Sequence, residues 1–502
     1  MLSRPARGWD PYRLAWLAPF AVAAFVVVAS PSRLDTAVAA LAGLAVVVLV
    51  ARRPDVGMLA LIALLPFHSF FLSWIYAVGA PESIVRPLGA WKEAVTIGVI
   101  VAGFRGLRSM GRRLDRLDLF GLAYVAVVAF YALAPRLFAA SAPTGASERF
   151  LAFRASAFFV LLLLAARHAV LPESFMRRAL RLVMAVGIVV AVIAVFEFFF
   201  PATWNDFVVN KVKYTAYEIQ VLDVKPFNAL DIRYYGQIGG QQIVRVGSSF
   251  LSPLVLGFYL LIPFAAAIDR VARKGLHGAA ASCAFLTGTA LLLAQTRAAL
   301  IGAVIIGLVA IRPAVGRTTQ RRLQFGLLLA AAALVALPVA AATGLGARAT
   351  TAASGDEASA VDHVQSFWNG IQTIADHPIG QGLATSAGAG QRFQTQSTVI
   401  AENNYLQVGI ELGVGAMVLF VALTVALLRR LRAAVEWTAD LGGGAVRAMG
   451  LALAIGALFL QPWGDLPTAW TFWSLAGAVL GIAAARAAEH QPASVESRAL
   501  SL

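Results

Sequence analysis

The stretch AENNYLQVGIELGVGAMVLF at residues 401–420 decides the fold class. It is apolar and dotted with glycine over the length of about 20 residues that a membrane-spanning helix needs. Yet it begins with the carboxylate Glu402 and two asparagines, and a second carboxylate, Glu411, lies well inside it. An ionisable residue in a membrane span is costly and marks either a functional site or a polar face turned into a helix bundle.

The rest of the chain has the same apolar character. Of its 502 residues, 59% are hydrophobic and only 13% are charged, and the mean hydropathy is +0.76. These values predict an all-α polytopic membrane protein of twelve to fourteen spans. Candidate spans are centred near residues 22, 44, 66, 97, 127, 158, 190, 259, 286, 304, 333, 416, 453 and 476. The first apolar run, LAWLAPFAVAAFVVVAS, is expected to be a retained anchor, because no cleavage site follows it.

Basic residues alternate along the chain and predict the topology. Basic runs such as FRGLRSMGRRLDR (104–116), RHAVLPESFMRRALR (167–181), DRVARKG (269–275) and RRLR (429–432) fall in every second loop. The positive-inside rule therefore places these loops and both termini in the cytoplasm. The net charge of +15 is thus read as a topology signal beside lipid headgroups and not as a nucleic-acid surface.

Two long interruptions divide the spans into blocks. We expect N-terminal transmembrane helices at 1–200, a first periplasmic loop at 201–247, transmembrane helices at 248–343, a large periplasmic loop at 344–403 and C-terminal transmembrane helices at 404–502. The first loop holds Trp204, Tyr214 and Tyr217, which suit either sugar stacking or an interfacial aromatic belt. The large loop predicts an amphipathic helix over 360–375, lying on the membrane or on the bundle.

The sequence offers no metal or cofactor signature. The single cysteine, Cys283, lies inside a predicted span, the six histidines are scattered, and no nucleotide-binding loop or Asp-x-Asp pair is present. We therefore expect no cofactor and metal-independent chemistry.

Three charged residues are predicted at the outer ends of spans: Arg245, Arg297 and Glu402. An arginine on the translocated side runs against the topological bias, and either snorkelling or a local ion pair is its ordinary explanation. Two such arginines beside the long outer loops also suit a membrane-tethered anion, since the guanidinium fork makes paired hydrogen bonds to phosphate.

Glu411 is predicted to have a different role. Asn404 and Gln407 precede it by seven and four residues, so all three share one helical face that must point into the bundle. We expect Glu411 and Gln407 to serve packing and hydrogen bonding.

Four segments together resemble the O-antigen ligase and polymerase superfamily of bacterial membrane glycosyltransferases. They are RVGSSFLSPLVLGFYL (245–260), QTRAALIG (295–302), the loop from Trp368 that ends in HPIGQGL (377–383) and ENNYLQVGIELGVG (402–415). The resemblance covers roughly residues 240–420. It implies transfer of a glycan from an undecaprenyl diphosphate carrier to an acceptor sugar at the periplasmic face of the inner membrane, by an inverting reaction without a metal ion. Other envelope polysaccharide-assembly proteins are possible partners by the same resemblance.

The resemblance also assigns roles to residues. Arg245 and Arg297 match basic positions associated with the diphosphate, and Asn403 and Asn404 fall in the substrate-binding motif. Glu402 matches the position where ligases have a histidine, and an acidic residue there is more similar to polymerases. We therefore expect Glu402 to be the general base of a polymerase, with ligation as the alternative and with acceptor binding or helix capping as its other roles. The further loop arginine of the family has no clean counterpart, and Arg348 and Arg392 are the candidates to replace it.

Two other classes of protein remain open. Lys92, Glu93, Arg154 and Glu197 are charged residues inside spans, and these also fit a lipid-linked glycan flippase or secondary transporter. A structural scaffold of the cell envelope is the third class, and it predicts no polar site at all.

Overall fold

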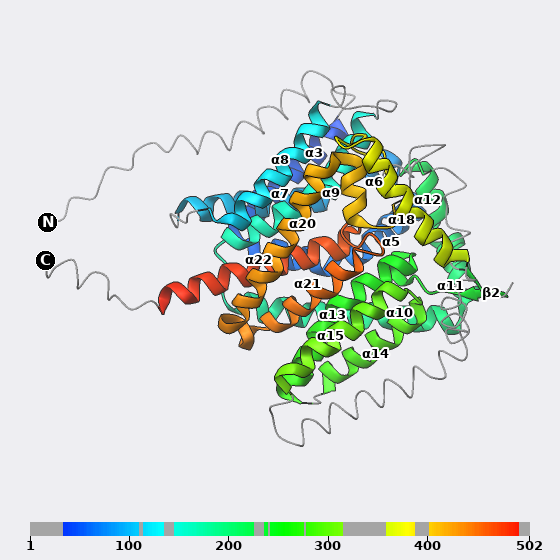
Figure 1. Ribbon diagram of the computed structural model, residues 1–502. Helices are drawn as coiled ribbons and strands as arrows, with labels where there is room; N and C mark the ends of the chain where they lie inside the picture. The colour runs from blue at the N-terminus through cyan, green and yellow to red at the C-terminus, as the bar shows by residue number, and fades with distance from the viewer. Residues whose placement is uncertain are drawn as a thin grey trace, which may run out of the picture.

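The computed structural model describes residues 34–109, 114–134, 145–224, 235–238, 241–275, 278–314, 358–386 and 401–490. Within these ranges the chain is almost entirely helical (Figure 1). The helices are α3 (Leu34–Arg52), α4 (Pro54–Leu64), α5 (His68–Ala77), α6 (Glu82–Leu88), α7 (Trp91–Ser109), α8 (Arg116–Leu133), α9 (Ala146–His168), α10 (Ser174–Phe199), α11 (Pro201–Asp206), α12 (Tyr214–Gln220), α13 (Pro253–Lys274), α14 (Gly278–Ala294), α15 (Arg297–Ala314), α18 (Ala358–Asp376), α20 (Asn404–Thr438), α21 (Gly443–Gly456) and α22 (Leu466–Glu489).

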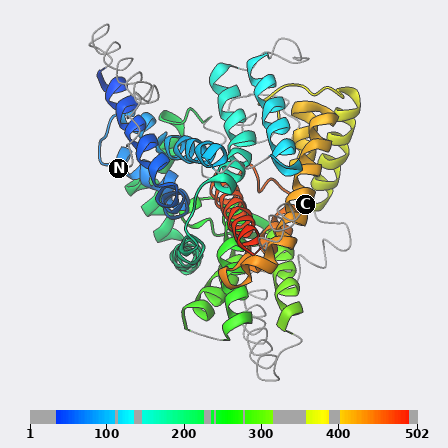
Figure 2. The same ribbon diagram turned by 90° about the vertical axis from the view of Figure 1, so that its left-hand side faces the viewer.

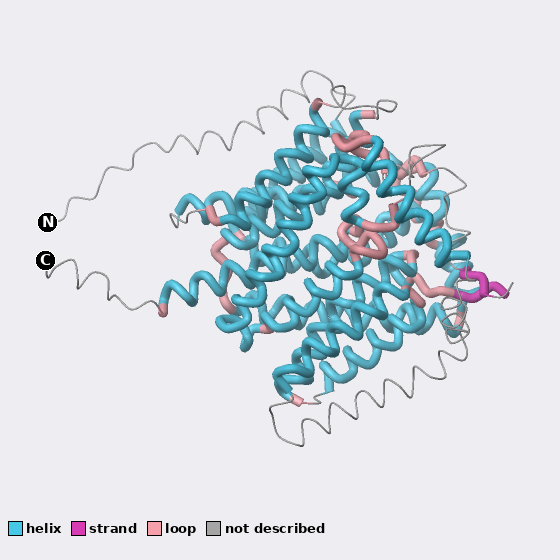
Figure 3. Tube along the Cα trace, viewed as in Figure 1, coloured by secondary structure: helices cyan, strands magenta, loops and turns pink. Residues whose placement is uncertain are grey.

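Short elements connect the long helices. The 3₁₀ turns η2 (Leu65–Phe67) and η8 (Ala439–Leu441) and the π-helical turn η4 (Phe207–Lys211) connect helices, and the 3₁₀ turn η7 (Ser248–Phe250) precedes α13. The strands β1 (Tyr235–Ile238) and β2 (Gln241–Val244) form one antiparallel hairpin with Tyr235 opposite Val244. Figure 3 shows this hairpin projecting from one end of the helical body.

The prediction of an all-α polytopic membrane protein is confirmed. Seven helices in the described ranges are long and apolar enough to cross a membrane, and four shorter apolar helices accompany them. The seven are Pro54–Ala77, Arg116–Leu133, Glu148–His168, Ser174–Phe199, Pro253–Lys274, Asn404–Leu441 and Leu466–Glu489. The predicted spans centred near residues 22 and 333 lie outside the described residues, and every other predicted centre falls in a helix.

The last helix, α22, forms the centre of the bundle. Trp470 and Trp473 are fully buried, and Figure 2 shows α22 (red) surrounded by the other helices. Its close packing on α9 depends on two glycines: a Cβ at Gly477 would lie 2.3 Å from the Leu163 carbonyl oxygen, and one at Gly481 would lie 2.5 Å from that of Arg167. The small residues let the two backbones touch, as is common in membrane bundles.

The end of the bundle that carries the basic loops is joined by an ion cluster. Asp115, the N-cap of α8, accepts hydrogen bonds from Arg167 of α9 at 2.6 and 2.8 Å and pairs with Arg430 of α20 at 2.9 Å. The bonds from Arg167 hold the pKa of the Asp115 carboxyl well below its usual range. The cluster therefore ties three helices together at this end.

Three aromatic residues of the first outer loop are packed inside. Trp204, Tyr214 and Tyr217 are 7%, 4% and 1% exposed, and they form a small core with Leu72 and Val85. They are therefore buried packing residues, and neither a sugar platform nor a membrane-interface belt describes them.

The charged residues Lys92 and Arg154 share one carboxylate, that of Glu93. Arg154 donates to Glu93 at 2.7 Å, Lys92 lies 3.5 Å from the same carboxylate, and Lys92 also contacts His68 at 2.9 Å. Buried charges that pair in this way are tolerated inside a membrane bundle, so their presence requires no transport pathway.

Candidate functional site

The site begins with α18, the amphipathic helix of the large outer loop, which lies along α20. This confirms the helix predicted for 360–375. The contact is made by Gly370 and Ile374 of α18 with Leu406, Gly409 and Ile410 of α20, and a Cβ at Gly409 would lie 2.6 Å from the Ile374 Cδ1 atom. α18 thus lies on the bundle, with one helical face against the N-terminal turns of α20 (Figure 1, yellow on orange).

The chain that follows α18 enters a break in α20. Gly413 has φ 84° and ψ 171° in the middle of the helix, and Gly380 of the HPIGQGL segment has φ 91°. The loop and the helix are hydrogen-bonded to each other at this point: Gln381 N–H donates to Ile410 O at 2.7 Å, and Val414 N–H donates to Pro378 O at 2.9 Å. The break in α20 therefore supplies free backbone groups that anchor the loop.

The docking of α18 brings His363 onto Glu402. The His363 Nδ1 atom contacts the Glu402 carboxylate, and the Glu402 backbone N–H donates to Ser366 Oγ at 3.3 Å. The two side chains remain 36% and 37% exposed, so both can reach a substrate. Sequence reasoning did not assign His363 a role, although His363, Ser366, Gly370 and Ile374 follow one another at helical spacing on the face that contacts α20.

The two asparagines after Glu402 hold the backbone of the site. Asn403 caps α20, since its Oδ1 accepts from the N–H groups of Tyr405 and Leu406 at 2.8 and 3.1 Å, while its Nδ2 donates to Leu458 O. Asn404 accepts from the Trp463 N–H at 3.0 Å and donates its own N–H to Ala457 O. Both amides are thereby tied to the segment that follows α21, and contact of either with substrate stays a prediction.

A run of polar groups leads inward from Asn404 to Glu411. Asn404 Nδ2 donates to Gln407 Oε1 at 3.1 Å, and Glu411 follows Gln407 by four residues on the same face of α20. The Glu411 carboxylate, only 2% exposed, also accepts from the Ser386 backbone N–H at 3.3 Å. Glu411 therefore joins the end of the large loop to α20, in line with the packing role predicted for it.

Arg245 is positioned by a buried carboxylate. Glu197 of α10, 1% exposed, accepts from the backbone N–H groups of Gly247 at 3.0 Å and Ser248 at 2.6 Å. Ser248 has φ 51°, a left-handed conformation, and its hydroxyl donates to Val190 O. Glu197 therefore fixes the bend that follows Arg245, which is a role the sequence did not indicate.

The two predicted arginines meet at one turn. Arg245 donates from Nε to Ala294 O at 3.3 Å and from Nη2 to Thr296 Oγ1 at 3.5 Å, and the next residue, Arg297, begins α15 with an exposed side chain. α15 packs against α21, with Gly302 facing Ala452, so Arg297 lies at the same end of the bundle as the Asn404 contacts with Ala457 and Trp463. Arg245, Arg297 and Glu402 are thus gathered at one end of the molecule. Arg348 and Arg392 lie outside the described residues.

A further acidic residue, Asp465, directly precedes α22 and lies two residues after Trp463. Burial raises the pKa of its carboxyl to about 7. A group with such a pKa can gain or lose a proton at neutral pH, so Asp465 is a second carboxyl to be weighed at this end. Among the described residues no three His, Cys, Asp or Glu side chains cluster to hold a metal ion.

The site and fold define a multi-pass membrane protein with the His363–Glu402 pair and two arginines at the same end. Residues 282–421 match the family model described as O-antigen ligase. The matched range includes Arg297, α18 with His363, and Glu402, whereas Arg245 precedes it. The match confirms the resemblance to the O-antigen ligase and polymerase superfamily, and it supports a glycosyltransferase of the ligase or polymerase type. No curated protein matches the chain.

Proposed function

We propose that the protein transfers a glycan from an undecaprenyl diphosphate carrier to an acceptor sugar at the periplasmic face of the bacterial inner membrane, and that it acts as a polymerase. The observation that carries the proposal is the contact between His363 and Glu402. It joins an imidazole and a carboxylate, both partly exposed, inside the segment that matches the O-antigen ligase model.

The proposed reaction is a single inverting displacement. The acceptor hydroxyl oxygen bonds to the anomeric carbon of the donor sugar while the bond from that carbon to the diphosphate oxygen breaks. The hydroxyl proton passes to the Glu402–His363 pair, and the bonding electrons leave with the diphosphate. A carboxylate that holds an imidazole can orient it and stabilise the charge it gains, so the pair serves as one proton-accepting unit.

Arg245 and Arg297 are proposed to stabilise the departing diphosphate. Both lie at the turn between α14 and α15, and arginine is the side chain best suited to bidentate bonds with phosphate oxygens. Positive charge fixed in advance at the leaving group lowers the barrier without a metal ion.

The outward face of α18 suits a lipid-linked substrate. Val364, Phe367, Trp368 and Ile371 are 59%, 41%, 61% and 37% exposed, so an apolar surface extends from the helix that carries His363. We propose that this face contacts the hydrocarbon of the membrane and that the lipid-linked donor reaches the His363–Glu402 pair from there.

Polymerisation is favoured over ligation by the identity of residue 402. An acidic residue stands where the resemblance gives ligases a histidine, and here the histidine, His363, comes from α18 instead. The alternative from another class is a transporter or flippase of lipid-linked glycans. The charged residues inside predicted spans favoured that alternative, but three of them, Lys92, Glu93 and Arg154, pair with each other.

The test uses purified protein in liposomes that contain an undecaprenyl diphosphate-linked repeat unit. A polymerase lengthens the glycan on the carrier, and a ligase moves it only when lipid A-core acceptor is added. Movement of the donor between leaflets without any new glycosidic bond would instead identify a flippase and end the proposal.

A further inference from the structure

In the described part of the chain, two basic hollows beside the η8 turn lie at the end of the bundle opposite the Glu402 site. The first, of about 270 Å³, lies between α10, α13 and η8, and its charged lining is Arg177, Arg181, Arg270, Arg273, Lys274 and Asp440. The second, of about 550 Å³, lies between α20 and α21. The α10–α13 hollow is the more strongly charged of the two.

The α10–α13 hollow has more cations than carboxylates in its lining. Arg273 is held by Asp269 at 2.6 Å, and Asp440 is held by Arg486 at 2.7 Å, so these groups are already engaged. In the part of the chain that the structure describes, no carboxylate lies within ion-pair distance of the other four cations, Arg177, Arg181, Arg270 and Lys274. Four like charges around so small a volume repel one another, and a bound anion would relieve that repulsion.

The base of the same hollow is apolar. Leu180 and Met184 of α10 and Ala266 of α13 line it, and they are 9%, 7% and 4% exposed. Both helices are membrane spans, and the cations lie in the first turns of α10 and the last turns of α13, where the spans leave the hydrocarbon. The lining therefore combines apolar and cationic side chains, as the acyl chain and the headgroup of an acidic phospholipid require.

We propose that the α10–α13 hollow binds the headgroup of an acidic phospholipid from the leaflet at this end. The guanidinium groups contact the phosphate oxygens, since arginine forms charge-assisted bonds of this kind, and the start of an acyl chain lies on Leu180, Met184 and Ala266. A free anion would use the cations but would leave the apolar base unfilled.

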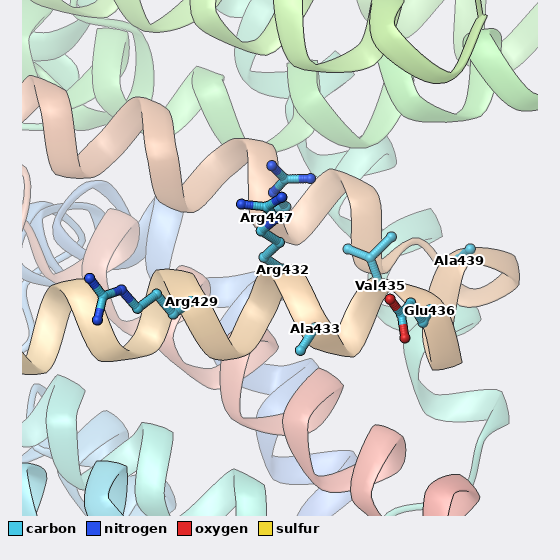
Figure 4. A pocket seen from close by; sticks show the side chains of 7 residues that line it. All are labelled: Arg429, Arg432, Ala433, Val435, Glu436, Ala439 and Arg447. Atoms are coloured by element: carbon cyan, nitrogen blue, oxygen red, sulfur yellow. The ribbon is translucent and has the colours of Figure 1, made fainter. Parts of the chain in front are cut away.

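The α20–α21 hollow provides a matched control. Figure 4 shows the side chains of Arg432 and Arg447 among those that line this hollow, with Arg429 further along α20. This hollow also contains a carboxylate, Glu436, and its apolar lining consists only of Ala433, Val435 and Ala439. Removing Arg429 and Arg432 therefore takes two charges from the same end of the protein without touching the proposed site.

The experiment compares three forms of the full chain, purified in detergent: the wild type, Arg177→Gln with Arg270→Gln, and Arg429→Gln with Arg432→Gln. Native mass spectrometry measures the retention of added dioleoyl phosphatidylglycerol, with dioleoyl phosphatidylcholine and inorganic phosphate as comparison probes. Each lost basic residue near the surface weakens lipid attraction about fivefold, so the Arg177/Arg270 variant should bind phosphatidylglycerol about 30-fold more weakly, and the control should stay within about threefold of the wild type.

Three results would overturn the proposal. Equal loss in both variants would mean a general attraction by the basic end, and equal retention of phosphatidylcholine would mean that charge is irrelevant. Displacement of the lipid by an equimolar amount of inorganic phosphate would mean a site for free anions. If the glutamine variant fails to fold, Arg177→Lys with Arg270→Lys keeps the charge and should lose only part of the affinity.

Discussion

Replacing Gly413 by alanine should separate the large outer loop from α20. At φ 84° and ψ 171° only glycine is comfortable, and another residue costs about 1–3 kcal/mol. The added Cβ would also lie 2.6 Å from both the Pro378 carbonyl oxygen and the Ile379 carbonyl carbon, and overpacking of that kind costs about 1–3 kcal/mol more. The free energy of unfolding should therefore fall by roughly 2–6 kcal/mol.

The matched control for this change lies two residues further along the same helix. A Cβ at Gly415 would meet no atom within 4 Å, so Gly415→Ala should leave the stability unchanged or raise it by up to about 1 kcal/mol. Thermal unfolding of both variants in detergent, followed by tryptophan fluorescence, measures the difference. Equal melting temperatures for Gly413→Ala and Gly415→Ala would refute the role assigned to the break in α20.

Two further predictions concern the two ends of the bundle. Arg245→Ala and Arg297→Ala should each weaken binding of the lipid diphosphate by about 1.5–3 kcal/mol, with partial rescue by lysine, as measured by titration of the purified protein with undecaprenyl diphosphate; unchanged affinity in both would make the arginines structural. Asp115→Asn keeps the Oδ1 acceptor that caps α8 but loses the negative charge and the Oδ2 acceptor of the bond from Arg167 Nη2. Because the folded-state pKa of Asp115 is lowered, its contribution is present above about 3.8 and is lost as the pH falls through the folded-state pKa. At pH 7 the free energy of unfolding of Asp115→Asn should therefore be about 1–3 kcal/mol below that of the wild type, as measured by thermal unfolding. This difference in stability should narrow below pH 3.8, and a difference that does not depend on pH would contradict the prediction.

The sequence was sufficient for the apolar helices of the described residues and for the helix predicted over 360–375, because both depend on local hydropathy and its period. The sequence also predicted that Arg245, Arg297 and Glu402 lie at the same end of the bundle, since alternating basic loops fix which side each span end faces. These are properties that neighbouring residues determine together.

Contacts between distant segments could not be predicted in the same way. The His363–Glu402 pair joins residues 363 and 402 through the packing of α18 on α20, and the break at Gly413 exists because the loop at Gly380 enters it. Glu197 looked like a lone charge in a span, yet it accepts two backbone N–H groups fifty residues away in the sequence. A local pattern carries no information on such partners.

The central claim is that Glu402 and His363 act as one proton-accepting unit. Its most direct test is the rate of glycan transfer by purified Glu402→Gln, His363→Ala and the double variant, with binding of the lipid donor measured in parallel. Loss of general base catalysis costs about 10² to 10⁴ in rate, and groups that act as a unit are not additive. Both single variants should therefore bind the donor normally and fall to a similar low rate, with the double variant no slower than either. Asp465→Asn, at the alternative carboxyl of this end, should keep most of the activity. Near-normal transfer by Glu402→Gln, or its loss in Asp465→Asn alone, would contradict the account.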